Sequence, residues 1–211
     1  MKNKFKIVIP SYNNQDWVKI NLESILEQDY QNYEVLYIND CSTDNTKKIV
    51  EEMVGKNPKF NIHTNEKNMK RGYNIAPKNL EHFFDNGEDI LVFIDGDDWL
   101  PTPDVFSKLN DFYNKQKCWM TYGGMVCWEG GDDVRPANPQ NSPHSDSVHS
   151  EKMYRKDVWR ASHLRTFKWF LYNKIKDNDL RYSKTKEYYF HAEDLASSYP
   201  CLEMCPKNKI G

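Results

Sequence analysis

The chain has 211 residues, 38% of them hydrophobic and 14% aromatic, which fits one folded domain and excludes a disordered chain. Its 29 basic and 31 acidic side chains give a net charge of −2, so no nucleic-acid partner is expected, because dedicated nucleic-acid binders show a strong basic excess. No apolar run reaches the length of a membrane span or a signal-peptide core, so we predict a cytoplasmic protein with no membrane span.

The first half of the chain alternates between strand-like and helix-like runs. Short apolar runs predict strands at 5–9, 35–38, 60–63 and 90–94. Apolar residues at helical spacing predict helices at about 18–26, 44–54, 73–84 and 104–113. Such alternation is typical of βαβ units. We therefore predict an α/β fold, a Rossmann-like sandwich with a central, mainly parallel sheet.

The second half is less regular. Residues 118–128 predict one strand or a bent pair, and 129–150 is a polar segment that we expect to be a long loop. Helical spacing predicts a helix over 163–175 and another over 195–204, the latter containing Pro200. No internal repeat is visible. We expect 1–211 to be a single domain, and it is compatible with being part of a longer chain.

Three of the predicted strands end in polar residues suited to a nucleotide. These segments are 10–13, 39–42 and 95–98. In a parallel sheet, ligands bind beyond the carboxyl ends of the strands. One polar loop alone is as often an ordinary connection, so the order and spacing of all three indicate the site.

The acidic segment Asp95-Gly96-Asp97-Asp98 points to a specific chemistry. Three carboxylates within four residues repel one another, and a hard divalent cation relieves that repulsion. Mg²⁺ and Mn²⁺ favour oxygen ligands and bridge carboxylates to substrate phosphates. Gly96 permits a close approach of the backbone to a ligand. The alternative is a solvated acidic turn that caps the next helix.

Together these motifs resemble those of a known family. Successive segments are similar to the motifs of family-2 glycosyltransferases of the GT-A type over about residues 5–115: Ile9–Asn13, Asn39–Asp44, Asn68 with Arg71-Gly72, and Phe93–Asp98. Glu193-Asp194 resembles the late acidic motif of the family. The resemblance implies a GT-A fold in which 1–115 binds the nucleotide-sugar and 116–211 forms the acceptor side.

The resemblance also implies roles for single residues in binding the donor. It places Tyr12 and Asp40 at the base, with Arg71 assisting, and either Asp95 or Asp97 near the ribose. The full set implied for the donor is Pro10, Ser11, Tyr12, Asp40, Arg71, Asp95, Gly96 and Asp97.

The remaining implied roles concern the metal and the acceptor. Asp97 or Asp98 would hold Mn²⁺ or Mg²⁺, and Asp194 would be the general base, with Glu193 as the alternative. Four histidines, at 144, 149, 163 and 191, are candidates for contacts with acceptor or phosphate, although a single histidine more often has a structural role.

The function implied by the resemblance is glycosyl transfer. An inverting enzyme would move a sugar from a nucleoside-diphosphate sugar, with a UDP-hexose as the expected UDP-sugar donor, to a hydroxyl of a glycan or protein acceptor. The alternative, from a different class, is a non-catalytic nucleotide-sugar-binding module. A nucleotidyltransferase is less favoured because the chain has no glycine-rich, basic phosphate loop near its start.

Overall fold

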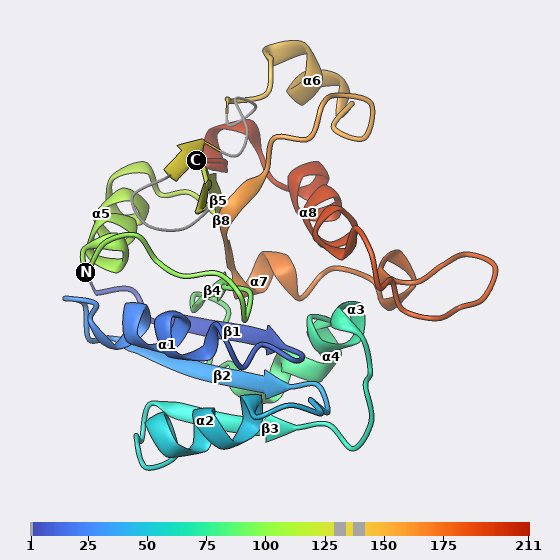
Figure 1. The fold of residues 1–211 in the computed structure, drawn as a ribbon. Coiled ribbons are helices and arrows are strands. Elements are labelled where there is room, and N and C mark those ends of the chain that lie inside the picture. The colour runs from blue at the N-terminus through green and yellow to red at the C-terminus, as the bar shows by residue number, and fades with distance from the viewer. Residues whose placement is uncertain (1, 129–133, 137–141) are drawn as a thin grey trace.

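A computed structural model describes residues 2–128, 134–136 and 142–211 (Figure 1). The first half contains β1 (Phe5–Ser11), α1 (Val18–Leu26), β2 (Tyr33–Asn39), α2 (Thr46–Val54), β3 (Phe60–Thr64), α3 (Arg71–Asn74), α4 (Pro77–Leu80), a 3-10 turn η1 (Glu81–Phe83), β4 (Ile90–Phe93) and α5 (Val105–Gln116). The second half contains β5 (Met120–Gly123), β6 (Val126–Trp128), β7 (Val134–Pro136), α6 (Asp146–Glu151), β8 (Ser162–Lys168), α7 (Trp169–Tyr172), η2 (Asp177–Leu180), α8 (Glu193–Met204) and η3 (Lys207–Lys209).

Six strands form the central sheet in the order β3-β2-β1-β4-β8-β5. The first four are parallel to one another, whereas β8 runs antiparallel to both β4 and β5. The predicted α/β fold with a mainly parallel sheet is therefore confirmed. The carboxyl ends of β1, β2 and β4 point to one side of the molecule, where the predicted binding segments begin (Figure 1).

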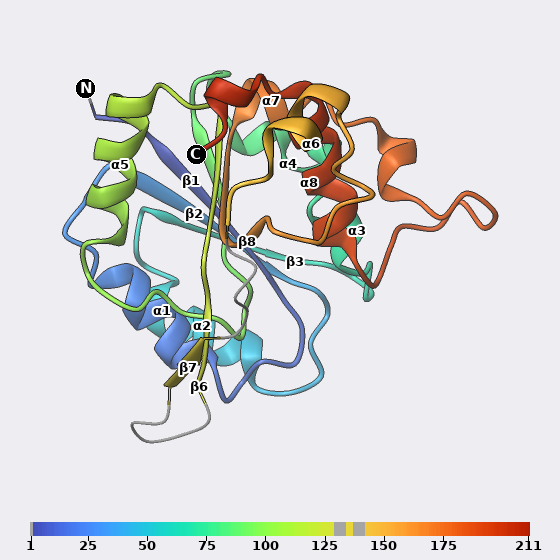
Figure 2. The same cartoon turned by 90° about the horizontal axis from the view of Figure 1, so that it is seen from above.

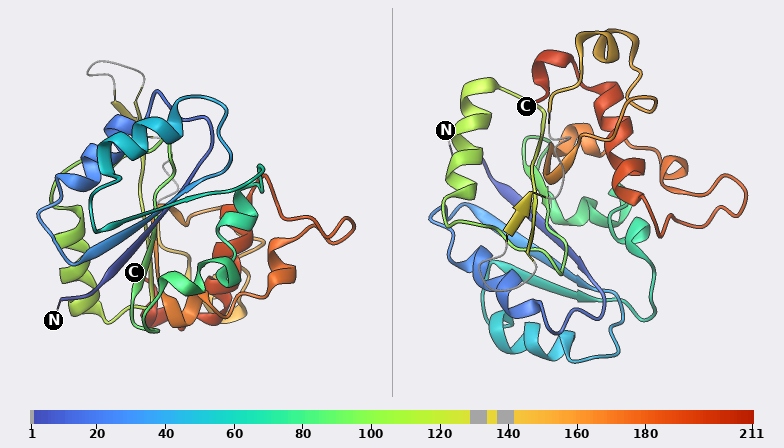
Figure 3. Two further views of the ribbon diagram at one scale, coloured as in Figure 1. Left: turned by 90° about the horizontal axis from the view of Figure 1, so that it is seen from below. Right: turned by 45° about the horizontal axis from the view of Figure 1, so that its top comes forward.

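Helices cover both faces of this sheet. On one face α1, α2 and α5 pack against alternate residues of β1, represented by Ile7 and Ile9. On the other face α4, α7 and α8 pack against Val8 and its neighbours (Figure 3). The strands are apolar on both faces because both are covered, which explains why they read as continuous apolar runs.

The short hairpin of β6 and β7 is separate from the main sheet and projects beside α1 (Figure 2). It occupies part of the segment 129–150 that was predicted as one long loop. That prediction is wrong for 134–136 and for α6, while 129–133 and 137–141 lie outside the described residues. The N-terminus of α6 is capped by Ser145, whose Oγ accepts from the N–H of Val148.

Two helix predictions also fail. The predicted helix over 73–84 is broken because Pro77 lacks a backbone N–H and forces Ala76 into an extended conformation. The predicted helix over 163–175 begins instead as strand β8 and becomes helical only at Trp169. The predicted helix at 195–204 is confirmed as α8, with Pro200 inside it. None of the described helices is long and apolar enough to cross a bilayer.

Candidate active site

The ends of β1, β2 and β4 bring the predicted binding segments together. Ser11 pairs with Asn39 at the end of the β1–β2 ladder. The N–H of Asp40 donates to the carbonyl of Ser11 at 2.8 Å, and the N–H of Gly96 donates to the carbonyl of Pro10 at 3.3 Å. The three segments therefore form one continuous edge, as the sequence predicted from parallel strand order.

Gly96 is required here by a close contact within the protein. A Cβ added at this residue would lie 2.6 Å from Oγ and 2.7 Å from Cβ of Ser11, closer than real side-chain atoms approach. From the sequence, Gly96 was expected to allow a close approach of the backbone to a ligand. The described contacts give it a structural reason, which is the packing of the loop after β4 against the end of β1.

Polar side chains on α1 and just after its end hold the backbone of the acidic loop and of the segment that follows it. Asn21 Nδ2 donates to the carbonyls of Asp95, at 3.0 Å, and Asp98, at 2.6 Å. One and two turns further along, Ser24 Oγ accepts from the N–H of Leu100, and Gln28 Nε2 donates to the carbonyl of Thr102. Because these bonds go to backbone atoms, they hold the main chain of residues 95–102 against α1.

Asp40 is almost completely buried and anchors the segment that leads to α3. Its Oδ1 accepts from Asn65 Nδ2 and from the N–H of Met69, both at 2.7 Å, and its Oδ2 accepts from the N–H of Lys70 at 2.9 Å. Three donors on one carboxylate give it a positioning role for the residues around Arg71. The contact with a base that the resemblance implies for Asp40 stays a prediction.

Arg71 ties the acidic loop to the second half of the chain. Its guanidinium forms an ion pair with Asp95 and another with Glu193, whose Oε1 lies 3.0 Å from Nε. Burial alone would raise the pKa of Asp95, but the charge of Arg71 holds that pKa well below its ordinary value. Asp95 is therefore ionised at neutral pH, in a site where its charge is partly compensated.

A group of possible metal ligands lies beside this ion pair. Single donor atoms of Asp95, Asp98 and His163 all lie within 4.8 Å of one another, a spacing at which three side chains can hold one ion. Burial, followed by repulsion from Asp95, raises the pKa of Asp98, as expected for carboxylates placed together. Asp97 is exposed and outside this group. Of the two predicted metal ligands, the structure brings only Asp98 into the cluster.

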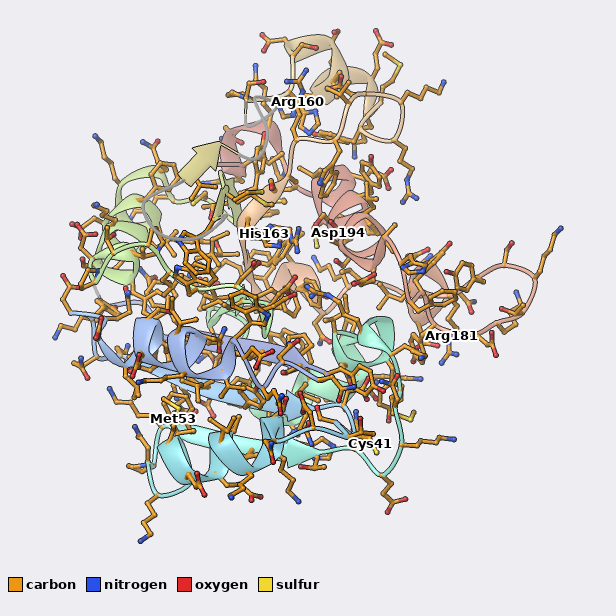
Figure 4. All side chains as sticks on the ribbon, viewed as in Figure 1. Cys41, Met53, Arg160, His163, Arg181 and Asp194 are labelled. Carbon is orange, nitrogen blue, oxygen red and sulfur yellow. The ribbon has the colours of Figure 1, made fainter. Side chains whose placement is uncertain are left out.

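The predicted base faces the same site from α8. Asp194 Oδ2 lies 3.4 Å from Nη1 of Arg165, and Nη2 of Arg165 lies 3.2 Å from Nε2 of His163. His163 on β8 and Asp194 at the start of α8 thus contact one arginine from two elements (Figure 4). Glu193, the alternative base, is engaged by Arg71 instead.

The described residues bring most of the predicted set into this region, but not all contact one another. Tyr12, directly after β1, is 45% exposed, so its ring is accessible from solvent. No sequence signal pointed to Asn21, and His163 was expected only as a contact to acceptor or phosphate. Arg165 was expected on a solvated face, with an offset of phosphate charge as the alternative; the solvated face is wrong, because Arg165 is buried. Predicting a strand at 162–168 in place of a helix would have revealed the positions of His163 and Arg165. Paired antiparallel with β4, that strand places residues 163 and 165 beside the acidic loop.

The comparison with family profiles settles the class of protein. The sequence matches the family described as Glycosyl transferase family 2 over residues 6–181, which is most of the chain. The chain belongs to this family. The resemblance stated from the motifs is thereby confirmed, and the match extends beyond 115 into the second half.

The curated relatives that the chain resembles include named bacterial glycosyltransferases. TarS of Staphylococcus aureus (strain Mu50), named poly(ribitol-phosphate) beta-N-acetylglucosaminyltransferase, is 32% identical over 99 residues, 46% of this chain and 17% of TarS. The putative teichuronic acid biosynthesis glycosyltransferase TuaG of Bacillus subtilis (strain 168) is 28% identical over 120 residues, 56% of this chain and 45% of TuaG. The chain thus spans less than half of these curated relatives.

Solved structures confirm the GT-A fold. The crystal structure of S. aureus TarS 1-349 in complex with UDP-GlcNAc has a TM-score of 0.63 at 20% identity, covering 93% of this chain and 54% of that one. The crystal structure of S. aureus TarS 1-349 has a TM-score of 0.67 at 22% identity, covering 98% of this chain and 57% of that one. Mannosyltransferase PcManGT from Pyrobaculum calidifontis, in complex with GDP-Man and Mn²⁺, reaches 0.51 at 21% identity, covering 58% and 36%.

Proposed function

We propose that this chain transfers a sugar from a nucleoside-diphosphate sugar to an acceptor hydroxyl with inversion at the anomeric carbon. The observation on which the proposal rests most is the meeting of two groups from opposite halves of the chain. Asp95 and Asp98 follow β4, and the Arg165–Asp194 pair comes from β8 and α8. An acidic donor site beside a carboxylate that can accept a proton is the minimum this reaction needs.

The donor is proposed to be a UDP-sugar, with a UDP-hexose as the first choice. Support comes from the family match and from the TarS structure described with UDP-GlcNAc. Residues 1–115 would bind it, with Tyr12 at the exposed rim close to the base. Residues 116–211 would form the acceptor side. The acceptor is proposed to be a hydroxyl of a glycan or protein. The poly(ribitol-phosphate) in the name of TarS is the first acceptor to test.

A divalent cation fits the residues present. Two carboxylates and an imidazole with donor atoms within 4.8 Å form a suitable ligand set, and Asp98 with Asp95 would hold the ion. A bound Mn²⁺ or Mg²⁺ would stabilise the negative charge of the departing nucleoside diphosphate. Asp97 stays an alternative to Asp98 because it is adjacent in the same loop, and the two are to be tested side by side.

Asp194 is proposed as the general base that takes the proton from the acceptor hydroxyl. Its orientation is fixed on both oxygens, since Oδ1 accepts from the N–H of Leu195 at 2.8 Å and Oδ2 faces Arg165. Its side chain is 30% exposed, so an acceptor can approach it from solvent. Attack by the activated hydroxyl on the face opposite the leaving diphosphate inverts the anomeric centre.

Calorimetry with UDP, with and without Mn²⁺, tests the donor site. Asp98→Asn should abolish the Mn²⁺-dependent part of UDP binding, whereas Asp111→Asn, an exposed acid on α5, should leave it unchanged. If Asp98 is the ligand, Asp97→Asn should, like Asp111→Asn, leave the Mn²⁺-dependent part of UDP binding unchanged. UDP binding that is equal in the presence and absence of Mn²⁺ would remove the metal assignment.

Transfer is tested separately, with release of UDP from UDP-GlcNAc as the readout. Asp194→Asn should keep UDP affinity and lower turnover by roughly 10²–10⁴-fold, the usual contribution of a general base. Full activity of this variant would show that the base lies elsewhere. Wild-type chain that binds donor with no turnover on any acceptor would favour the alternative, a nucleotide-sugar-binding module.

A further inference from the structure

The position of His163 follows from the register of two strands. In the antiparallel β4–β8 pair, Phe93 lies opposite Arg165 and Ile90 opposite Lys168. Continuing this register by two residues places His163 beside Asp95, just beyond the end of β4. The measured distances agree, since Nε2 of His163 lies 3.6 Å from Asp95 Oδ2 and 3.7 Å from Asp98 Oδ2.

The hydrogen bonds of the imidazole define which nitrogen faces the carboxylates. Nε2 is 3.2 Å from Nη2 of Arg165, and a guanidinium can only donate, so Nε2 is the acceptor in this pair. The proton then sits on Nδ1, which is 3.1 Å from the thioether sulfur of Met125, a weak acceptor. His163 therefore carries its lone pair on Nε2, the nitrogen that lies near Asp95 and Asp98. In the metal-free chain this lone pair accepts from Arg165, so a bound cation would take the place of that hydrogen bond.

The charges around this lone pair suit a divalent ion. Four carboxylates, two from the loop after β4 and two from the start of α8, face the two guanidiniums of Arg71 and Arg165. The ion pairs engage Asp95, Glu193 and Asp194, and Asp98 is the carboxylate without an arginine partner among them. A divalent cation placed between Asp95 and Asp98 would offset the charge that the two guanidiniums do not reach.

We propose that His163 is a nitrogen ligand of the divalent cation held by Asp95 and Asp98, and that it makes the site prefer Mn²⁺ and Co²⁺ over Mg²⁺. The proposal rests on the metal site of the proposed function and specifies its selectivity. Mg²⁺ demands octahedral oxygen ligands and retains its water, so an imidazole in the ligand set disfavours it. First-row transition ions accept nitrogen, with affinity increasing from Mn²⁺ to Co²⁺.

Electron paramagnetic resonance on Mn²⁺ added to the full chain provides a readout that does not depend on turnover. The bound ion should show hyperfine coupling to a directly bonded ¹⁴N, and this coupling should disappear in His163→Gln. The same substitution should weaken Mn²⁺ binding by at least about tenfold, since loss of a group that only orients a ligand already costs 10–100-fold. Binding of Mg²⁺ should change less than about threefold.

Two further variants complete the design. His82→Gln, an exposed histidine of η1, is the matched control and should keep the coupling and the affinity. His163→Asp replaces nitrogen by oxygen, so it should still bind an ion but with the Mn²⁺-to-Mg²⁺ preference reduced. Circular dichroism during thermal unfolding checks that both substitutions at 163 leave the chain folded.

The outcomes separate this inference from the proposed function. Mn²⁺ that binds in an Asp98-dependent manner without nitrogen coupling in the wild type overturns the role of His163 and leaves the metal site intact. Failure of Mn²⁺ to bind, with or without UDP, overturns both. If the substitutions at 163 unfold the chain, the presence or absence of nitrogen coupling in the wild type still tests the inference. If His163→Gln is folded and the coupling persists, His163 is not its source.

Discussion

Replacing Asn21 by alanine removes both hydrogen bonds that α1 donates to the carbonyls of Asp95 and Asp98. A buried carbonyl left without a donor costs about 1–3 kcal/mol; Asp95 and Asp98 are only partly buried, so we take the lower half of that range for each, roughly 3 kcal/mol for the two together. The substitution also removes Asn21 Oδ1, a buried acceptor with no hydrogen-bond partner among the described residues, which offsets roughly 1 kcal/mol of that cost. We therefore expect Asn21→Ala to lower the free energy of unfolding by about 2 kcal/mol.

Urea denaturation measures this effect. With a slope of roughly 2 kcal/mol per molar urea, the expected loss shifts the midpoint down by about 1 M. Asn21→Asp should be at least as destabilising, because an ionised carboxylate accepts but cannot donate to the two carbonyls. The matched control is Asn61→Ala on the exposed edge of β3, which should stay within about 0.5 kcal/mol of wild type.

The same variant should loosen the candidate metal ligands. Once the loop after β4 loses its support from α1, the carboxylates of Asp95 and Asp98 are no longer held at one spacing, so Mn²⁺ affinity should fall together with stability. A midpoint for Asn21→Ala equal to that of Asn61→Ala would refute the reasoning. It would mean that water replaces Asn21 at both carbonyls without cost.

Two further substitutions test the contact of Gly96 with Ser11 and the hydrogen bond between His144 Nδ1 and Asp157 Oδ2, which is 2.7 Å long. Gly96→Ala places a methyl group 2.7 Å from Cβ of Ser11, well inside van der Waals contact, so it should destabilise the fold by roughly 1–3 kcal/mol and lower the melting temperature by about 3–10 °C. An unchanged melting temperature would show that the loop shifts without cost. The hydrogen bond from His144 lowers the pKa of Asp157 to about 2, whereas the pKa of an aspartate in the unfolded chain is near 3.9. The ionised carboxylate therefore stabilises the fold at any pH above about 3.9, and this stabilisation is lost as the pH falls toward 2. Asp157→Asn should therefore lower stability at pH 7 but not at pH 2, whereas the exposed Asp179→Asn should show no such dependence.

The parallel part of the fold could be predicted because each signal was local. The apolar runs of β1, β2 and β4 and the polar residues after them lie next to one another in sequence, and parallel order brings their carboxyl ends to one edge. The break at Pro77 was also visible locally and was overlooked.

The second half could not be predicted in the same way. Leu164, Phe167 and Leu171 fall at helical spacing, but β8 is covered on both faces and between two strands, so its burial does not alternate. Short apolar segments of this kind are ambiguous by periodicity alone. The error displaced His163 and Arg165 from the site, because their place depends on pairing with β4, about 70 residues earlier.

The insertion of β8 between β4 and β5 has a consequence for dividing or recombining the chain. A fragment ending at 115 would lack β8, so β4 would become an edge strand. The four residues of β4 are apolar and buried in the whole chain, and their unpaired backbone groups could then pair with other molecules. A chimera that exchanged residues 116–211 with a relative would replace that partner strand, and with it His163, Arg165 and the proposed base Asp194. Donor chemistry and acceptor activation would then be inherited together rather than as interchangeable modules.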